Sequence, residues 1–152
     1  EELNRETAMK VDGQCHCGST TFEAEVDPEK TFICHCTDCQ QLTGTAFRVA
    51  VPSRPGTFRL LSGAPKIYVK IADSGARREQ AFCPDCGTPL YSASVAPEPR
   101  AHILRVGTLR QRTALVPNLQ LWSRSAQGWL AGLHEIPRHD TQPTFGTDGR
   151  LK

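Results

Sequence analysis

Phe82-Cys83-Pro84-Asp85-Cys86-Gly87 contains two cysteines that are separated by two residues and followed directly by a glycine. A similar stretch, Cys15-His16-Cys17-Gly18, occurs near the start of the chain. A glycine in this position permits a tight turn whose amide groups point at the sulfurs and support thiolate charge. Together the two stretches supply four thiolates, the donor set of a closed, tetrahedral structural zinc. The candidate ligands of this site are Cys15, Cys17, Cys83 and Cys86.

A structural zinc would matter for this chain because its hydrophobic content is low, at 38% of 152 residues. Zinc binding of the finger type contributes about 10–16 kcal/mol. The cysteines number seven and lie in tight groups, whereas a disulfide framework favours an even number. We therefore interpret the cysteines as metal ligands rather than as disulfides or ordinary buried thiols.

The third cysteine group, Cys34-His35-Cys36-Thr37-Asp38-Cys39, supplies three thiolates and no clear fourth ligand. Three protein ligands and one open position are typical of a catalytic zinc. The spacing also permits a different four-thiolate site, which would leave the remaining three cysteines outside it: Cys36, Cys39, Cys83 and Cys86. A redox dithiol at Cys36 and Cys39 is a third possibility, although the βαβ context of thioredoxin-like sites is missing.

The histidines inside these groups, His16 and His35, are not our first choice as ligands. In an extended segment, residues i and i+2 face one way and the residue between them faces the other. If the cysteines on both sides of a histidine reach the metal, the ring points away from it. We therefore expect His16 to be structural and consider His35 a residue of a substrate cleft.

Short stretches bounded by Gly, Pro, Asp or Ser recur along the chain and predict eight strands. They cover residues 20–26, 47–51, 57–61, 66–71, 79–82, 89–95, 102–106 and 118–122. The one weak helix candidate is Asp38–Thr43. This spacing predicts an all-β fold, an antiparallel sandwich or open barrel with little helix. We expect six aromatic residues of the strand-like stretches to lie in the core rather than to contact a ligand: Phe22, Phe47, Phe58, Phe82, Tyr91 and Trp122.

The same pass along the chain predicts one zinc-binding β domain at residues 13–136. Residues 1–12 are polar and lack periodicity, which predicts a flexible N-terminal segment. Residues 1–8 precede the only methionine and are either native or left over from expression. Residues 137–152 are polar and rich in Pro and Gly, which predicts a loose C-terminal tail.

Charge and hydropathy argue against nucleic-acid and membrane partners. The 18 basic and 16 acidic residues leave a formal charge of +2, too little for a typical nucleic-acid-binding surface. No apolar run approaches the ~20 residues of a membrane helix, and no secretory segment opens the chain. We expect a soluble, cytoplasmic protein, and the sequence leaves its oligomeric state open.

Taken together, the cysteine motifs resemble the glutathione-dependent formaldehyde-activating enzyme family, which includes the centromere-protein-V-like proteins. The similar motifs are Gly-x-Cys-His-Cys-Gly at residues 13–18, Cys-His-Cys-x-x-Cys with a later Gly-Thr at residues 34–45, and Phe-Cys-x-x-Cys-Gly-Thr-x-Leu-Tyr at residues 82–91. The resemblance extends to Trp129 and implies an Mss4-like β fold. It also implies a structural zinc at Cys15, Cys17, Cys83 and Cys86 and a catalytic zinc at Cys34, Cys36 and Cys39.

The resemblance implies a zinc-dependent carbon–sulfur lyase similar to S-(hydroxymethyl)glutathione synthase, which joins glutathione to formaldehyde. A sulfur-rich zinc polarises water weakly but accepts another thiolate readily, which fits a thiol substrate. In this scheme His35 or water protonates the developing alkoxide. Arg48 is the first candidate to bind a carboxylate of glutathione, and the further candidates are Lys70, Arg77 and Arg78.

Two alternatives remain open at the level of sequence. Family members often carry a histidine at the position of Gln120, and a neutral amide cannot titrate near pH 7. This departure is compatible with a related enzyme that acts on another small thiol or carbonyl compound. The second alternative is a non-catalytic zinc-binding module with an Mss4-like fold.

Overall fold

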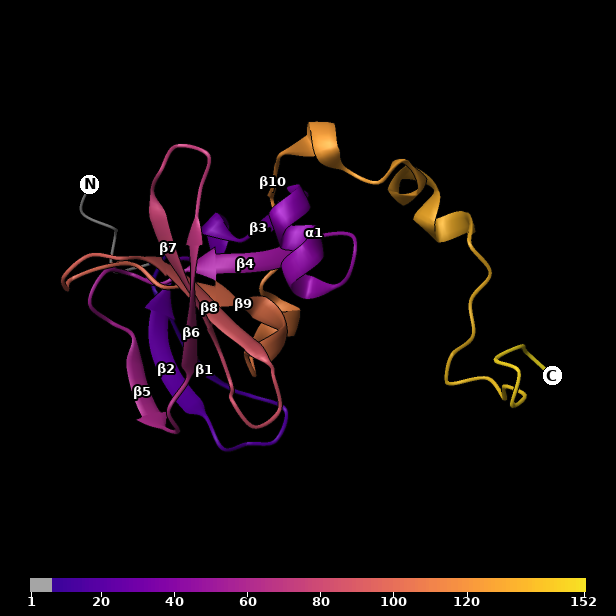
Figure 1. Cartoon of the computed structure of the whole chain (residues 1–152), viewed down its shortest axis with the longest axis horizontal. Coiled ribbons are helices and arrows are strands. Elements are labelled where there is room, and N and C mark those ends of the chain that lie inside the picture. Colours follow the sequence, from indigo (N-terminus) through magenta and orange to yellow (C-terminus); the bar gives the residue numbers. More distant parts are fainter. Residues whose placement is uncertain (1–6) are drawn as a thin grey trace.

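Two β-sheets form most of the computed structural model, which describes residues 7–152 (Figure 1). The smaller sheet has the strand order β1-β2-β5, and the larger one has the order β10-β3-β4-β9-β8-β7-β6. The strands are β1 (Met9–Gln14), β2 (Thr21–Val26), β3 (Phe32–Cys34), β4 (Arg48–Pro52), β5 (Arg59–Ser62), β6 (Lys66–Ile71), β7 (Arg77–Phe82), β8 (Pro89–Ser94), β9 (Ile103–Arg105) and β10 (Leu119–Leu121). All pairings are antiparallel except that of β10 with β3. The mostly antiparallel all-β architecture agrees with the fold class predicted from the sequence.

The structure contains all eight predicted strands and two that the sequence pattern did not reveal, β1 and β3. β1 pairs with β2 over its whole length, from Met9 opposite Val26 onward. Residues 9–12 therefore belong to a paired strand, and the boundary expected at residue 13 is wrong there. Residues 1–6 of the predicted flexible segment lie outside the described residues. Gly13 interrupts the alternation of β1 because Phe22 packs against it, and a Cβ on Gly13 would lie 2.4 Å from the ring.

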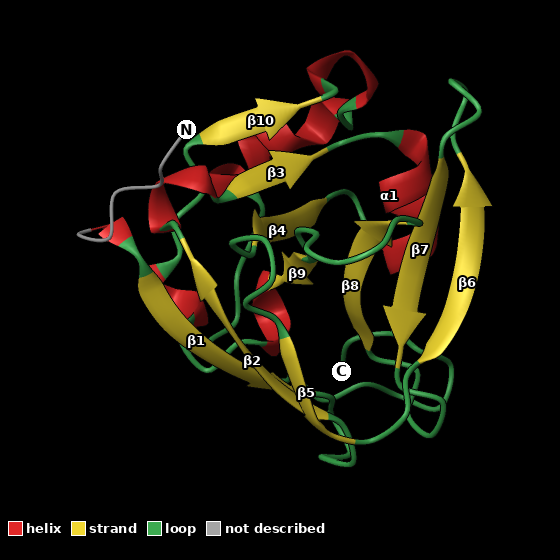
Figure 2. Ribbon diagram, turned by 90° about the vertical axis from the view of Figure 1, so that its left-hand side faces the viewer, coloured by secondary structure: helices red, strands yellow, loops and turns green. Residues whose placement is uncertain are grey.

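The hydrophobic core lies between the two sheets (Figure 2). Phe22 of β2 and Leu104 of β9 are almost completely buried there. Phe22 stacks on Phe58 with a centroid distance of 5.5 Å, and Phe58 in turn contacts the ring of Tyr91. Trp122 departs from the prediction of a core position, since 52% of its surface is exposed. It follows β10, an edge strand of the larger sheet, and has no second sheet to pack against.

The face of the larger sheet that points away from this core carries polar and charged residues. The register places Cys34 of β3 opposite Arg48 of β4. Arg105 of β9 lies opposite Ala50, two residues after Arg48, so the side chains of Cys34, Arg48 and Arg105 share one face. The same alternation continues through β8 to Gln80 of β7. This polar face supplies most of the residues discussed below.

The α-helix of the described chain, α1 (Thr37–Thr43), confirms the helix candidate and begins one residue earlier. Cys36 caps its N-terminus, and Gly44 ends it in the left-handed region with φ of 67°. Asp38 in the first turn forms an ion pair with Lys70 of β6, at 2.6 Å. This contact ties α1 to the polar side of the larger sheet.

Short 3-10 helices occupy several connections and the region after β10. They are η2 (Pro28–Lys30), η3 (Val106–Thr108), η4 (Arg112–Ala114), η5 (Ser123–Ser125) and η6 (Gly128–Glu135). From η6 onward the chain runs away from both sheets (Figure 1). Residues 137–152 form hydrogen bonds with one another, as between the Lys152 N–H and the Thr144 carbonyl oxygen. Across the described residues, no helix combines the length and apolar character needed to cross a membrane.

Candidate functional site

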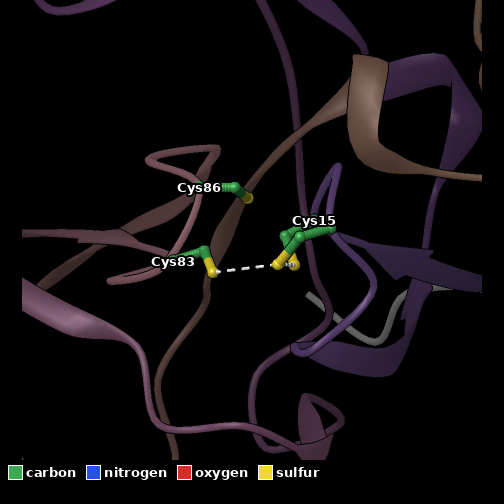
Figure 3. A group of neighbouring side chains, drawn as sticks. Cys15, Cys83 and Cys86 are labelled. Carbon is green, nitrogen blue, oxygen red and sulfur yellow. Dashed lines mark hydrogen bonds between the residues drawn. The ribbon is translucent and has the colours of Figure 1, made fainter.

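The first candidate metal centre joins the two glycine-containing cysteine turns. The sulfurs of Cys15, Cys17, Cys83 and Cys86 all lie within 4.8 Å of one another. Figure 3 shows the labelled thiols gathered from two segments of the chain, Cys15 from one and Cys83 and Cys86 from the other. Gly18 and Gly87 adopt φ values of 82° and 78°, as expected for the tight turns that these glycines permit. Cys15 and Cys83 are fully buried, whereas Cys17 and Cys86 are exposed.

The spacing of these sulfurs fits a tetrahedral metal ion. At a zinc–sulfur distance of about 2.3 Å, neighbouring ligand sulfurs lie about 3.8 Å apart. Cys15 Sγ is 3.6 Å from Cys17 Sγ, which is 3.8 Å from Cys83 Sγ. The four thiols fill all four positions, so this centre is closed.

Hydrogen bonds around the closed centre favour thiolates. The Ser19 hydroxyl lies 3.4 Å from Cys83 Sγ and, together with backbone N–H groups of Cys86 and Asp85, lowers the pKa of Cys83 to about 5. The hydroxyl of Thr88 is the main cause that lowers the pKa of Cys86 to about 7. Since thiolates are the metal-binding form of cysteine, these donors prepare the centre for a cation.

The second candidate centre contains Cys34, Cys36 and Cys39, whose sulfurs also lie within 4.8 Å of one another. Cys34 ends β3, Cys36 is the N-cap of α1 and Cys39 lies in its first turn. The cysteines thus divide into groups of four and three. The alternative site that combined Cys36 and Cys39 with the cysteines of the β7–β8 turn does not form.

The surroundings of the second centre differ from thiol to thiol. Burial raises the pKa of Cys39 to about 12. Although burial also opposes ionisation of Cys36, the Cys39 backbone N–H, 3.3 Å from Cys36 Sγ, helps to lower the pKa of Cys36. With only three thiols, this centre leaves a position free for a further ligand.

Two hollows lie on the same side of the larger sheet as Arg48, and only the first has a cysteine of the second centre in its wall. The first has a volume of about 490 Å³ and includes Cys36, Lys70, Trp122 and Arg124 in its wall; we call it the Cys36 hollow. The second has a volume of about 430 Å³ and lies over the polar face of the larger sheet; we call it the arginine hollow. Its lining includes Leu42 of α1 and, from the sheet, Arg48, Tyr68, Gln80, Phe82 and Arg105.

The basic candidates occupy different places. Arg48 is buried, 7% exposed, and acts electrostatically on all three cysteines of the second centre. Lys70 lines the Cys36 hollow but is paired with Asp38. Arg78 donates to Ser92 at 3.3 Å on the polar face, whereas Arg77 is exposed and belongs to the opposite face of β7.

Arg105 is a site residue that the sequence analysis missed. It is as buried as Arg48, and its Nη2 donates to Gln80 Oε1 at 2.9 Å. Burial, reinforced by repulsion from Arg48, lowers the pKa of Arg105 to about 9. The sequence feature that could have identified Arg105 is its position between two apolar residues of a predicted strand. Its place beside Arg48 depends on the pairing of β4 with β9, which the sequence does not specify.

His35 is buried, and its Nε2 lies 2.7 Å from Gln120 Oε1. With the amide oxygen as acceptor, Nε2 carries the proton of the ring. Neither hollow beside the second centre includes His35 in its lining. His16 is exposed, and its backbone N–H donates to the Thr88 hydroxyl at 3.0 Å.

The chain is similar to known proteins in family and in fold. The profile of the family described as glutathione-dependent formaldehyde-activating enzyme matches residues 10–125, a range that contains both cysteine groups. No curated protein is significantly similar to the chain. A crystal structure of a Rhodobacter sphaeroides protein from structural genomics has a similar fold, with a TM-score of 0.55, 20% sequence identity and coverage of 72% of this chain and 98% of that one. Because the family profile spans most of the chain and all seven cysteines, the protein belongs to the glutathione-dependent formaldehyde-activating enzyme family, with its Mss4-like β fold.

Proposed function

We propose that this protein is a zinc-dependent enzyme that joins the thiol of glutathione to formaldehyde and forms S-(hydroxymethyl)glutathione. The observation that carries the proposal is the three-cysteine centre, which leaves one ligand position free and has Cys36 in the wall of a hollow. Family membership favours the same chemistry. A binding module with no reaction would have no need of an incomplete donor set next to open space.

Two zinc ions per chain fit the donor sets. The closed group of Cys15, Cys17, Cys83 and Cys86 would hold a structural ion. Cys34, Cys36 and Cys39 would hold the second, which when bound supplies a soft Lewis-acid position suited to a substrate thiolate. The seven cysteines are all unpaired, which suits a reducing compartment, and we accordingly propose a cytoplasmic location.

The reaction balances without a further reactant. The S–H bond of the thiol breaks, a bond forms between its sulfur and the formaldehyde carbon, and the carbonyl oxygen takes up a proton to become a hydroxyl. The reverse reaction is the carbon–sulfur lyase step. The positive charge of Arg48 lies where it favours an anionic substrate beside the cysteines.

Water and His35 are the two donors expected from the sequence for the proton that the alkoxide takes up. The contact between His35 Nε2 and Gln120 occupies one ring nitrogen, whereas both hollows are open to solvent. We therefore propose water as the donor and assign His35 a positioning role next to Cys34 and Cys36. Its carbonyl oxygen accepts from Gln40 Nε2 at 2.7 Å, which links the cysteine loop to α1.

The proposed activity can be measured by exchange NMR between glutathione, formaldehyde and their adduct. The zinc-loaded protein and its Cys36→Ser variant are compared at equal concentration above the uncatalysed background. We expect accelerated exchange with the wild-type protein alone. Equal rates for the two proteins would refute the proposed activity at this centre.

Gln120 favours a second candidate, a related enzyme for another small thiol. Because its neutral amide stands where family members often carry a histidine, the preferred thiol can differ from glutathione. Running the same exchange measurement with cysteine and coenzyme A separates the candidates: glutathione should give the largest acceleration.

A further inference from the structure

The polar face of the larger sheet holds two buried arginines that no acidic side chain neutralises. Arg48 and Arg105 are each 7% exposed, and neither forms an ion pair within the described residues. Arg105 acts on Arg48 as a like charge. Burying two mutually repelling cations without an anion costs free energy. The presence of such a pair in the fold therefore indicates a ligand that supplies the negative charge.

Gln80 holds the two guanidinium groups together from β7. Its Oε1 accepts from Arg105 Nη2 at 2.9 Å and from Arg48 Nη1 at 3.5 Å. The Nε atoms of both arginines are buried without any hydrogen-bond partner among residues 7–152. Arg105 Nη1 also donates to the Ile103 carbonyl oxygen at 3.3 Å. The acceptors of both cations are therefore neutral oxygens, and further N–H donors remain available for an anion.

The second metal centre does not account for this charge. Three thiolates around a divalent ion carry one net negative charge, whereas the two guanidinium groups carry two positive charges. Acidic side chains nearby have other partners, because Asp38 pairs with Lys70 and Glu79 pairs with Arg100. At least one positive charge thus remains for a ligand.

The arginine hollow above the pair indicates the class of ligand. Arg48, Gln80 and Arg105 belong to its wall, no acidic residue is part of that wall, and Leu42 and Phe82 make it partly apolar. A guanidinium fork matches a carboxylate in geometry, and a volume of about 430 Å³ accommodates a small organic acid.

We infer that Arg48 and Arg105, joined through Gln80, form a carboxylate-binding subsite in the arginine hollow. The subsite takes a small organic carboxylate and holds it next to the three-cysteine centre, since both arginines interact electrostatically with Cys34 and Cys39. The subsite recognises the carboxylate of the substrate and so determines which substrate reaches the three-cysteine centre. This role in substrate selection rests on the proposed function, whereas carboxylate binding itself does not. A glutathione carboxylate is one such ligand.

The binding test uses zinc-loaded protein and two probes without a free thiol, S-methylglutathione and succinate. ¹⁵N NMR follows the Nε–H signals of Arg48 and Arg105, and calorimetry gives the dissociation constants at low salt. Both probes should shift both arginine signals, and dimethyl succinate, which lacks the carboxylates, should not. If neither carboxylate shifts either signal, the subsite does not exist as inferred.

Substitutions then distinguish a ligand site from a structural role. We expect Arg105→Met to weaken binding of the carboxylate probes about 10-fold or more, and Arg105→Lys to weaken it less. The matched control is Arg77→Met, an exposed arginine on the other face of β7, which should bind as the wild type does. Zinc content should stay the same in all variants. Without ligand, the melting temperature of Arg105→Met should be unchanged or higher, because a buried, unmatched charge is removed.

The outcomes separate this inference from the proposed reaction. Wild-type affinity in Arg105→Met and in Arg48→Met would overturn the inference even if glutathione–formaldehyde exchange is accelerated. Carboxylate binding that depends on both arginines would uphold it even if no such exchange is observed, in which case only the proposed reaction fails.

Discussion

The two cysteine centres of this protein use the same ligand atom in opposite settings. The closed centre draws four thiols from two turns, and hydroxyl and backbone donors favour the ionised forms of Cys83 and Cys86. The open centre has three thiols at the junction of β3 and α1, with Cys39 buried so that its pKa rises to about 12. No cysteine of the first centre belongs to the wall of either hollow, whereas Cys36 of the second forms part of the wall of the Cys36 hollow.

We propose that donor number and surroundings, rather than residue type, separate the structural centre of this protein from the chemical one. The closed centre joins the β1–β2 turn to the β7–β8 turn, and so connects the two sheets. The open centre has buried cations and accessible space on its side of the larger sheet. Substitutions in the two centres should therefore affect different properties of the protein.

The largest expected effect is that of Cys83→Ser in the closed centre. A structural zinc contributes about 10–16 kcal/mol in finger-type sites, which is comparable to the whole stability of a domain, about 5–15 kcal/mol. We expect the variant to lose its cooperative unfolding transition, as followed by circular dichroism during heating. A cooperative transition close to that of the wild type would show that the closed centre does not hold the sheets together.

A smaller effect on the fold, but a large one on the chemistry, is expected for Cys36→Ser. The variant should retain one zinc instead of two, measured by elemental analysis, and should melt within a few degrees of the wild type. Glutathione–formaldehyde exchange should slow by about 100-fold or more, to the uncatalysed rate. Unfolding of this variant would remove the distinction between the two centres.

Gln120→Ala tests how much the contact between Gln120 and His35, which lies between Cys34 and Cys36 of the open centre, stabilises the protein. The substitution removes the oxygen that lies 2.7 Å from the buried His35 Nε2, and an unsatisfied buried donor costs about 1–3 kcal/mol. We expect the free energy of unfolding in urea to fall by that amount. Gln142→Ala, in the exposed tail, is the matched control and should leave the stability unchanged.

The smallest effect is expected from removal of residues 137–152. Their hydrogen bonds stay within the segment, which runs away from both sheets (Figure 1). The shortened chain should unfold within about 0.5 kcal/mol of the full chain and keep both zinc ions. A larger loss of stability would mean that the tail packs on the β domain in solution.

The sequence was sufficient for the elements whose signals are local. The alternating stretch at residues 20–26 and the turn glycines Gly18 and Gly87 predicted a strand and two turns that the structure contains. β3 was missed because it has only three residues, and β1 because Gly13 stands at a buried position of its pattern. Spacing alone left the division of the cysteines open, and the family resemblance indicated the grouping that the structure has.

The remaining features depend on contacts between distant residues. Arg105 reaches Arg48 only through the pairing of β9 with β4, and no local pattern specifies that register. Trp122 was expected in the core from its residue type, but its place after an edge strand leaves it exposed, with the Arg124 guanidinium 4.8 Å from its ring centroid. Edge position and register are properties of the whole sheet, which explains why these two predictions could not be made correctly.

Stepwise metal removal tests the central claim, that one centre holds the fold and the other performs the chemistry. The zinc-loaded protein is titrated with a chelator while zinc content, circular dichroism and glutathione–formaldehyde exchange are measured on the same samples. We predict that exchange falls to the uncatalysed rate as the first zinc leaves, with the dichroism unchanged, and that the fold is lost only with the second. Loss of the fold with the first zinc, or exchange that persists after it has left, would contradict this division between the two centres.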